Sequence, residues 1–273
     1  MAASPYWNLG LFILTLVSTV IAGAMQQGVN PLESPWQIWR GIPFSFTLLV
    51  ILASHEFGHY FMSIKRGMQV TLPYFIPAPS FIGTFGAFIK IKSPILDRRT
   101  LLDIGVAGPL AGFVVALPTL LVGLLLSETR PTVAENGAGL GSSLTFSLLS
   151  WIVFGQLPDN IDVILHPIAF SGWIGLLVTC LNLLPVGQLD GGHIAYALFG
   201  EKQRIMAKIV LIGLIILGVT GWMGWLVWAI ILMFMKLYHP PVVYDWIPLD
   251  PARRAIGWVA MIIFVITFTP VPF

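Results

Sequence analysis

Residues 43–64 read PFSFTLLVILASHEFGHYFMSI, and the interpretation of the whole chain starts from this stretch. It is long and apolar enough to cross a membrane as a helix, which takes about 20 residues. On a helix, His55 and His59 lie one turn apart on the same face and can hold a zinc ion, with Glu56 beside the metal as a general base. Ionisable side chains in hydrocarbon cost about 2.5–3.5 kcal/mol each, so they need partners, and a metal is the obvious one. The stretch therefore predicts a metalloenzyme site within a bilayer.

The composition supports a membrane protein. Of the 273 residues, 57% are hydrophobic and 10% are charged, and the mean hydropathy is +0.88. Soluble proteins carry about 25% charged residues. We therefore expect one integral-membrane domain over residues 1–273. The net charge of +2 is small and scattered, so no nucleic-acid partner is expected. The single cysteine, Cys180, excludes an internal disulfide framework and a multi-cysteine zinc site.

The apolar runs predict an all-α polytopic fold with six or seven transmembrane helices. The expected spans cover about 8–25, 43–64, 102–126, 164–185, 205–219, 222–236 and 255–269. Whether residues 205–236 form one span or two is left open, because one helix over this segment would be longer than a single crossing needs. Glycines at 218, 221 and 224 favour two short helices there, whereas one long tilted helix gives six spans.

The charges on the connecting segments predict the topology. Two segments, 65–101 and 188–208, are rich in basic residues and are expected to be cytoplasmic loops. The basic residues are Lys65, Arg66, Lys90, Lys92, Arg98, Arg99, Lys202, Arg204 and Lys208. Segment 127–163 is expected outside, because it has one basic residue against four acids: Glu128, Glu135, Asp159 and Asp162. Helical rise then places the HExxH histidines roughly 7–14 Å below the cytoplasmic surface.

Residues 68–96 do not fit a helix, because they contain four prolines. Residues 87–92 alternate apolar and polar side chains after Gly83-Thr84-Phe85-Gly86. This pattern predicts a short membrane-associated β-hairpin between the second and third spans. Its edge could add an extended peptide as a further strand, so Gly83 and Gly86 are candidate substrate-binding residues. Alternatively, the hairpin only closes the fold.

A catalytic zinc ion usually has three protein ligands, and HExxH supplies two. Asp190 is a candidate third ligand, because it follows a long apolar run and precedes Gly191 and Gly192. We expect these glycines to let the backbone unwind around a cavity. His193 competes with Asp190, because the two would share a face if the segment is helical. Spacing alone leaves both open.

The motifs together resemble a known family. HEFGH and the later stretch Asn182-Leu183-Leu184-Pro185-Val186-Gly187-Gln188-Leu189-Asp190-Gly191 resemble the paired motifs of the site-2 protease family, which are intramembrane zinc metalloproteases. Residues 83–87, residues 103–112 and His239-Pro240-Pro241 also resemble its prokaryotic and plastid members. Some members carry a PDZ or CBS module, and this sequence shows neither.

The resemblance implies specific roles. His55, His59 and Asp190 would be the ligands of one Zn²⁺ ion, and Glu56 would be the catalytic base. Asn182 matches a position that helps to hold the substrate or the transition-state oxygen. We expect a bacterial or archaeal plasma membrane in preference to a thylakoid or plastid membrane.

Two functions remain after these observations. The first is an intramembrane zinc endopeptidase that cuts in or near the transmembrane helix of a single-span membrane protein. The second is a polytopic metal transporter or sensor that binds zinc without hydrolysis. Glu56 discriminates between them, because hydrolysis needs a base and metal binding does not.

Overall fold

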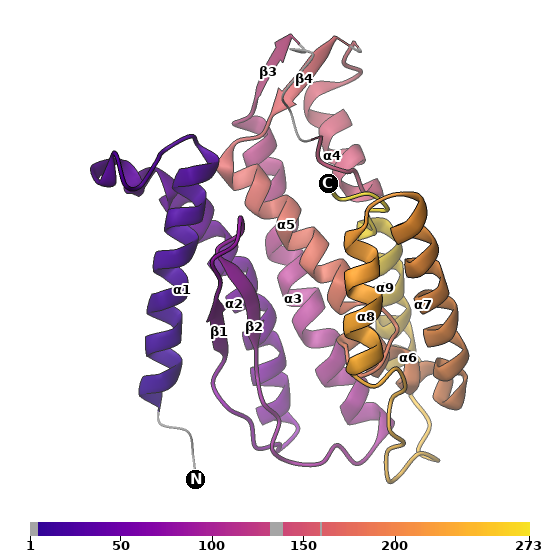
Figure 1. Cartoon of the computed structure of the whole chain (residues 1–273). Coiled ribbons are helices and arrows are strands. Elements are labelled where there is room, and N and C mark those ends of the chain that lie inside the picture. The colour runs from indigo at the N-terminus through magenta and orange to yellow at the C-terminus, as the bar shows by residue number, and fades with distance from the viewer. Residues whose placement is uncertain (1–4, 132–138, 159) are drawn as a thin grey trace. The chain divides into compact units, whose positions relative to one another are not determined.

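The computed structural model describes residues 5–131, 139–158 and 160–273, and they form a mostly helical protein with two small sheets (Figure 1). The chain divides into two compact units. The first unit comprises Met1–Ser93, Ala111–Pro131 and Leu157–Leu176, and the second comprises Pro94–Leu110, Thr132–Gln156 and Leu177–Phe273. Two of the acids counted for the topology, Glu135 and Asp159, lie outside the described residues.

A helix lies in each of the seven predicted apolar runs. The helices are α1 (Pro5–Gln26), α2 (Ile42–Lys65), α3 (Arg98–Leu125), α4 (Leu144–Phe154), α5 (Pro167–Asn182), α6 (Asp190–Phe199), α7 (Gln203–Thr220), α8 (Gly224–Phe234) and α9 (Pro251–Thr267), with short 3-10 helices at Pro35–Gly41 and Gly200–Lys202. Four helical stretches among the described residues are long and apolar enough to cross a membrane: Pro5–Gln26, Pro35–Lys65, Arg98–Leu125 and Asp190–Thr220.

In the first unit, a hairpin of β1 (Tyr74–Pro77) and β2 (Thr84–Phe88) lies beside α1 and α2 (Figure 1). Polar groups on α1 hold it in place. The Asn8 amide donates to the carbonyls of Leu72 and Pro73, and the Ser18 hydroxyl donates to the Gly83 carbonyl at 2.6 Å. These carbonyls lie just before the two strands, so the hydrogen bonds from α1 hold the start of each strand against the helix.

The hairpin was predicted with residues 83–92 as its strand-forming stretch, and the second strand is shorter than that. β2 covers Thr84–Phe88 and includes only the first two of the alternating residues 87–92. Within it, Gly86 has a φ of 97°, and the register shifts between Ile76 and Pro77. An irregularity of this kind twists and bends a strand. Beyond Phe88 only an isolated bridge between Val70 and Ile91 continues the pairing.

Segment 127–163 contains structure that was not predicted. Strands β3 (Glu128–Pro131) and β4 (Ile161–Ile164) pair in antiparallel fashion in the first unit. Helix α4 lies between them in sequence, and the Ser143 hydroxyl caps it by accepting from the Phe146 amide. Both strands are only four residues long, and β3 is exposed at every position, so no long apolar or alternating run in the sequence indicated them.

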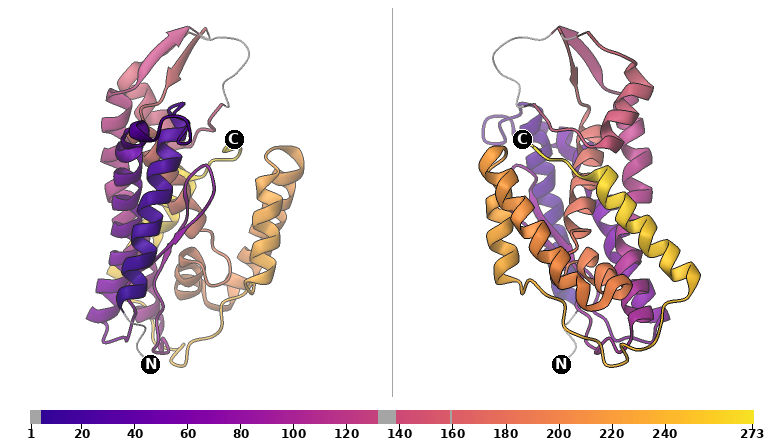
Figure 2. Two further views of the ribbon diagram at one scale, coloured as in Figure 1. Left: turned by 60° about the vertical axis from the view of Figure 1, so that its left-hand side comes forward. Right: turned by 90° about the vertical axis from the view of Figure 1, so that its right-hand side faces the viewer.

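In the second unit, α7 and α8 lie side by side (Figure 2). Their buried residues, including Leu214, Trp225 and Leu232, form one core cluster with Leu184 and Val186. The chain turns at Gly221–Met223, so residues 205–236 form two helices rather than one. This agrees with the two short helices that the glycines favour, although the number of membrane crossings stays a prediction.

One face of α7 is apolar and exposed. The residues on it recur every three or four positions: Ile205, Ile209, Ile212, Ile216 and Val219. Each is more than half exposed, with Val219 at 71%. A row of large aliphatic side chains this open fits a helix surrounded by lipid, where exposure of apolar area carries no hydration cost.

Candidate metal site

Three residues of the predicted site lie on the second half of α2, in the first unit. His55, Glu56 and His59 are 4%, 6% and 7% exposed, so ionisable groups are buried there inside a long apolar helix. The Nε2 atoms of His55 and His59 are 3.1 Å apart. Two nitrogens bound to one tetrahedral zinc at 2.0–2.1 Å would lie about 3.3 Å apart, so this spacing fits a shared metal ion.

Helix α3 closes one side of this pair. A Cβ added at Gly112 would lie 3.3 Å from both Cβ and Nδ1 of His55, which is tighter than ordinary contact. The glycine therefore lets α3 pass directly against the imidazole of His55 and limits where that ring can turn. A glycine at this position permits close packing of the two helices.

The other two predicted residues, Asn182 and Asp190, flank a break between helices in the second unit. Asn182 is the last residue of α5 and Asp190 is the first of α6, and residues 183–189 between them are not helical. The backbone amide of Gly187 donates to the carbonyl of Leu237 at 3.0 Å, which anchors this turn to the segment after α8. Asp190 is half-buried.

The expectation for Gly191 and Gly192 was wrong. They do not unwind the chain but lie in the first turn of α6, and both are buried. The backbone unwinds before Asp190 instead. A Cβ at Gly191 would lie 1.9 Å from the Leu183 carbonyl oxygen, and one at Gly192 would lie 2.4 Å from that of Gly187. The glycines are needed because the turn folds back onto α6. Segment 188–208, expected as a loop, is thus largely helical.

The two glycines proposed for substrate binding differ from each other. Gly83 has a φ of 81°, and a Cβ on it would lie 2.6 Å from the Ser18 carbonyl oxygen of α1. Its place in the structure is a turn pressed against α1. Gly86 also has a positive φ, but nothing lies within 4 Å of a Cβ there. Only Gly86 has open space beside it.

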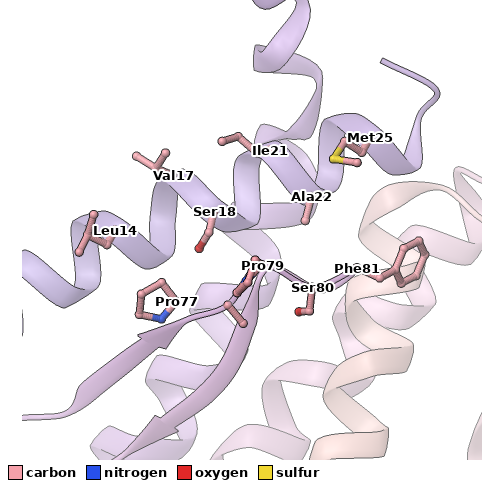
Figure 3. Close-up of a pocket in the computed structure, with 11 residues that line it drawn as sticks. Leu14, Val17, Ser18, Ile21, Ala22, Met25, Pro77, Pro79, Ser80 and Phe81 are labelled. Carbon is pink, nitrogen blue, oxygen red and sulfur yellow. The ribbon is translucent and has the colours of Figure 1, made fainter. Parts of the chain in front are cut away.

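A cavity of about 900 Å³ lies between α1 and the turn of the hairpin (Figure 3). Leu14, Val17, Ile21 and Met25 line it from α1. Its lining is mostly apolar, and the Ser18 hydroxyl on its wall already donates to the Gly83 carbonyl. A group that fills it would be apolar.

The structure also reveals a second histidine pair, which was not predicted. His193 of α6 and His239 of the loop after α8 lie 2.8 Å apart, from Nδ1 to Nε2. Burial lowers the pKa of His239 below its ordinary value. Both histidines are candidate metal ligands from the sequence, and their contact with each other was not predicted. Their contact joins positions 46 residues apart, and no spacing in the sequence predicts it.

Comparison with known proteins gives a family. The model of peptidase family M50 matches residues 43–220, which include α2 and the Asp190 turn. A protein of Arabidopsis thaliana named "Probable zinc metalloprotease EGY1, chloroplastic" is 31% identical over 289 residues, covering 96% of this chain and 52% of that protein. The protein of the same name from Oryza sativa subsp. japonica is 33% identical, covering 84% of this chain and 40% of that protein.

A third relative, "Probable zinc metalloprotease EGY2, chloroplastic" of Arabidopsis thaliana, is 33% identical over 64% of this chain and 32% of that protein. The chain thus spans about half or less of the length of these relatives. No solved structure matches. The family match covers well over half of the chain and includes both predicted motifs, so the chain belongs to peptidase family M50, as its resemblance to the site-2 proteases implied.

Proposed function

We propose that this chain is an intramembrane zinc endopeptidase that hydrolyses a peptide bond in or near a transmembrane helix of a membrane-anchored substrate. The observation that carries the proposal is the buried His55–His59 pair with Glu56 next to it on one helix. Family membership supports the reaction type, and the names of the relatives support zinc as the metal.

We propose Asp190 as the third zinc ligand. The family model matches one continuous stretch that includes both the HExxH helix and Asp190, which supports this choice. The competing ligand, His193, has its Nδ1 engaged with His239. Two imidazoles and one carboxylate form a donor set that zinc accepts in hydrolases, with one position left for water.

The residues divide the chemistry between them. Bound zinc would polarise a water molecule and lower its pKa towards neutrality. Glu56 would accept a proton from the water that attacks the peptide carbonyl and would pass it to the leaving amine. Asn182, at the end of α5, stabilises the oxygen of the attacked carbonyl through its amide.

The substrate must be extended for cleavage, because the carbonyls of a helix are hydrogen-bonded within it. We propose that the β1–β2 hairpin holds the unwound segment by strand addition at β2. The sheet has only these two strands in the described part of the chain, so β2 has an unpaired edge. Phe85 of β2 is 75% exposed, and the apolar cavity beside the hairpin suits the side chains of a membrane segment.

The proposed topology has seven spans, or six if α7 and α8 do not cross separately, with the hairpin membrane-associated and the site towards the cytoplasmic side. The basic residues of 65–101 and 188–208 support this orientation. The names of the matching relatives are marked chloroplastic, which weighs against the preference for a bacterial or archaeal membrane. We therefore propose a plastid-type membrane as the alternative to test first.

The deciding experiment is Glu56→Gln in the full chain, with zinc content and cleavage of a helical membrane reporter measured together. We expect one zinc per chain to remain and the cleavage rate to fall about 10²–10⁴-fold, because the variant lacks the base but keeps its shape. A variant that cleaves like wild type contradicts the peptidase. Wild-type protein that binds zinc without cleaving the reporter favours a metal transporter or sensor.

The third ligand needs a separate measurement. Asp190→Ala is expected to lose most bound zinc, while Asp162→Ala, which removes an exposed acid of β4, keeps it. Equal zinc content in the two variants would show that Asp190 is not a ligand.

A further inference from the structure

Around the second histidine pair, the hydrogen bonds determine which nitrogen carries each proton. His239 Nδ1 lies 2.5 Å from the Pro240 carbonyl oxygen, and because a carbonyl only accepts, Nδ1 must carry a proton. In a neutral ring Nε2 is then an acceptor. The His193 Nδ1, 2.8 Å away, therefore donates to it. For a neutral His193 ring, this contact selects the Nδ1–H tautomer.

His239 itself is held from several sides. Its backbone amide donates to the Gln203 side chain at 3.3 Å, and the Gln203 amide donates to the Pro185 carbonyl at 3.3 Å. Its ring stacks on Tyr196 with centroids 4.7 Å apart. His239 and Gln203 are buried, at 6% and 0% exposure, so these bonds lie in a site that water does not compete for.

The ion pair between Arg98 and Asp245 holds the hydroxyl end of Tyr196. The Tyr196 hydroxyl donates to Asp245 at 3.0 Å, and Arg98 at the start of α3 makes two hydrogen bonds of 2.7 Å to the same carboxylate. Bidentate arginine–carboxylate contacts fix orientation as well as distance. The loop 235–250 is thereby attached to the first turn of α3 and to α6, and it presents His239 to His193.

We propose that His239 is a positioning residue for the peptidase site. It fixes His193, which is one turn from Asp190 on the same face of α6, and so sets the orientation of the turn that carries Asp190. This inference rests on the proposed function, because it takes Asp190 to be a ligand. No role in binding or hydrolysis follows for His239 itself, since it acts only through His193.

The test is His239→Phe in the full chain, which keeps a ring against Tyr196 but removes both nitrogens. Measurements are the zinc dissociation constant of metal-depleted protein, by competition with a chelator, and kcat and KM on the helical reporter. Outer partners of metal sites typically contribute 10–100-fold, so we expect zinc binding about tenfold weaker and kcat reduced with KM unchanged. His239→Gln, which can still accept from His193, should restore most of the loss.

Two further variants keep the test decisive. The control His166→Phe changes the histidine before α5, which contacts Ser127 and Ile168 in the first unit, and should leave zinc affinity and kcat unchanged. If thermal unfolding shows that His239→Phe does not fold, Asp245→Ala releases Tyr196 and Arg98 instead and should weaken zinc binding about threefold, a smaller change than direct loss of an outer partner.

Nitrogen-15 spectra of histidine-labelled protein give a readout independent of activity. They should show His193 as the Nδ1–H tautomer in wild type and a changed tautomer mixture in His239→Phe. Folded variants with wild-type zinc affinity, kcat and His193 tautomer would overturn this inference alone. Wild-type protein that neither binds zinc nor cleaves the reporter would contradict the proposed function instead.

Discussion

His55 and His59 face each other across one turn of α2 with 3.1 Å between their Nε2 atoms, whereas His193 and His239 come from positions 46 residues apart and meet at 2.8 Å. The first pair has two like atoms converging, which suits a shared metal ion. In the second, Nδ1 meets Nε2, and the Pro240 carbonyl fixes the direction of the hydrogen bond. Similar distances thus have different interpretations, and the atoms that meet in each pair distinguish them.

The largest expected difference comes from removing one histidine of each pair. His59→Ala should reduce bound zinc from about one ion per chain to about a tenth or less at micromolar zinc, because a direct ligand is lost. His239→Ala should keep about one ion when zinc is in excess. Elemental analysis of purified protein checks both. Equal zinc loss in the two variants would contradict the assignment of zinc binding to the first pair alone.

The next largest effect is expected at the turn before the second pair. In Gly191→Ala the added Cβ would lie 1.9 Å from the Leu183 carbonyl oxygen, so either α6 or the turn must move. We expect a loss of about 3 kcal/mol or more, at the upper end of overpacking effects. Thermal unfolding in detergent measures it. Gly10→Ala on α1, with nothing within 4 Å, is the control and should not destabilise.

A smaller change should sharpen the view of the first pair. Gly112→Ala places a methyl group 3.3 Å from His55, which must shift by a few tenths of an ångström. A strain of about 1 kcal/mol corresponds to zinc binding about fivefold weaker. Chelator competition measures this, with Gly213→Ala on α7 as the unhindered control. Unchanged affinity would mean that α3 does not constrain the imidazole.

The smallest expected effect concerns pH and the ion pair behind the second pair. Hydrogen bonding from Arg98 holds the pKa of Asp245 below its ordinary value. Its stabilising contribution is therefore complete above the unfolded pKa, about 3.9, and is lost as the pH falls through the lower folded value. The difference in unfolding temperature between wild type and Asp245→Asn should be constant from pH 5 to 8 and shrink below about pH 4. A difference that changes around pH 6–7 would implicate a histidine instead.

Much of the fold followed from the sequence because long apolar runs have few alternatives. A run such as 43–64 must satisfy its backbone internally in lipid, and a helix does so. Local spacing also placed Glu56 between His55 and His59 correctly on one helix. Three short elements, β3, β4 and α4, were not predicted. They are only four to eleven residues long, and strand pairing and helix capping determine them.

The roles of the glycines could not be predicted for a different reason. A glycine in a sequence can mean a flexible backbone or a close approach, and only the neighbouring atoms distinguish the two. Gly191 was expected to unwind the chain and instead allows a carbonyl to pass next to a helix. Gly83 was expected beside the substrate and lies against α1, which leaves Gly86 as the open position of the hairpin.

The sequence by itself predicted the membrane class, the candidate metal-binding helix and the family, because helical periodicity and hydropathy act over a few consecutive residues. The tertiary structure alone decided that the chain unwinds before Asp190, that the glycines accommodate a returning backbone, and that His239 orients His193. These features depend on contacts between residues distant in sequence. Hydrogen-bond direction and steric clearance between such residues have no signature in local spacing.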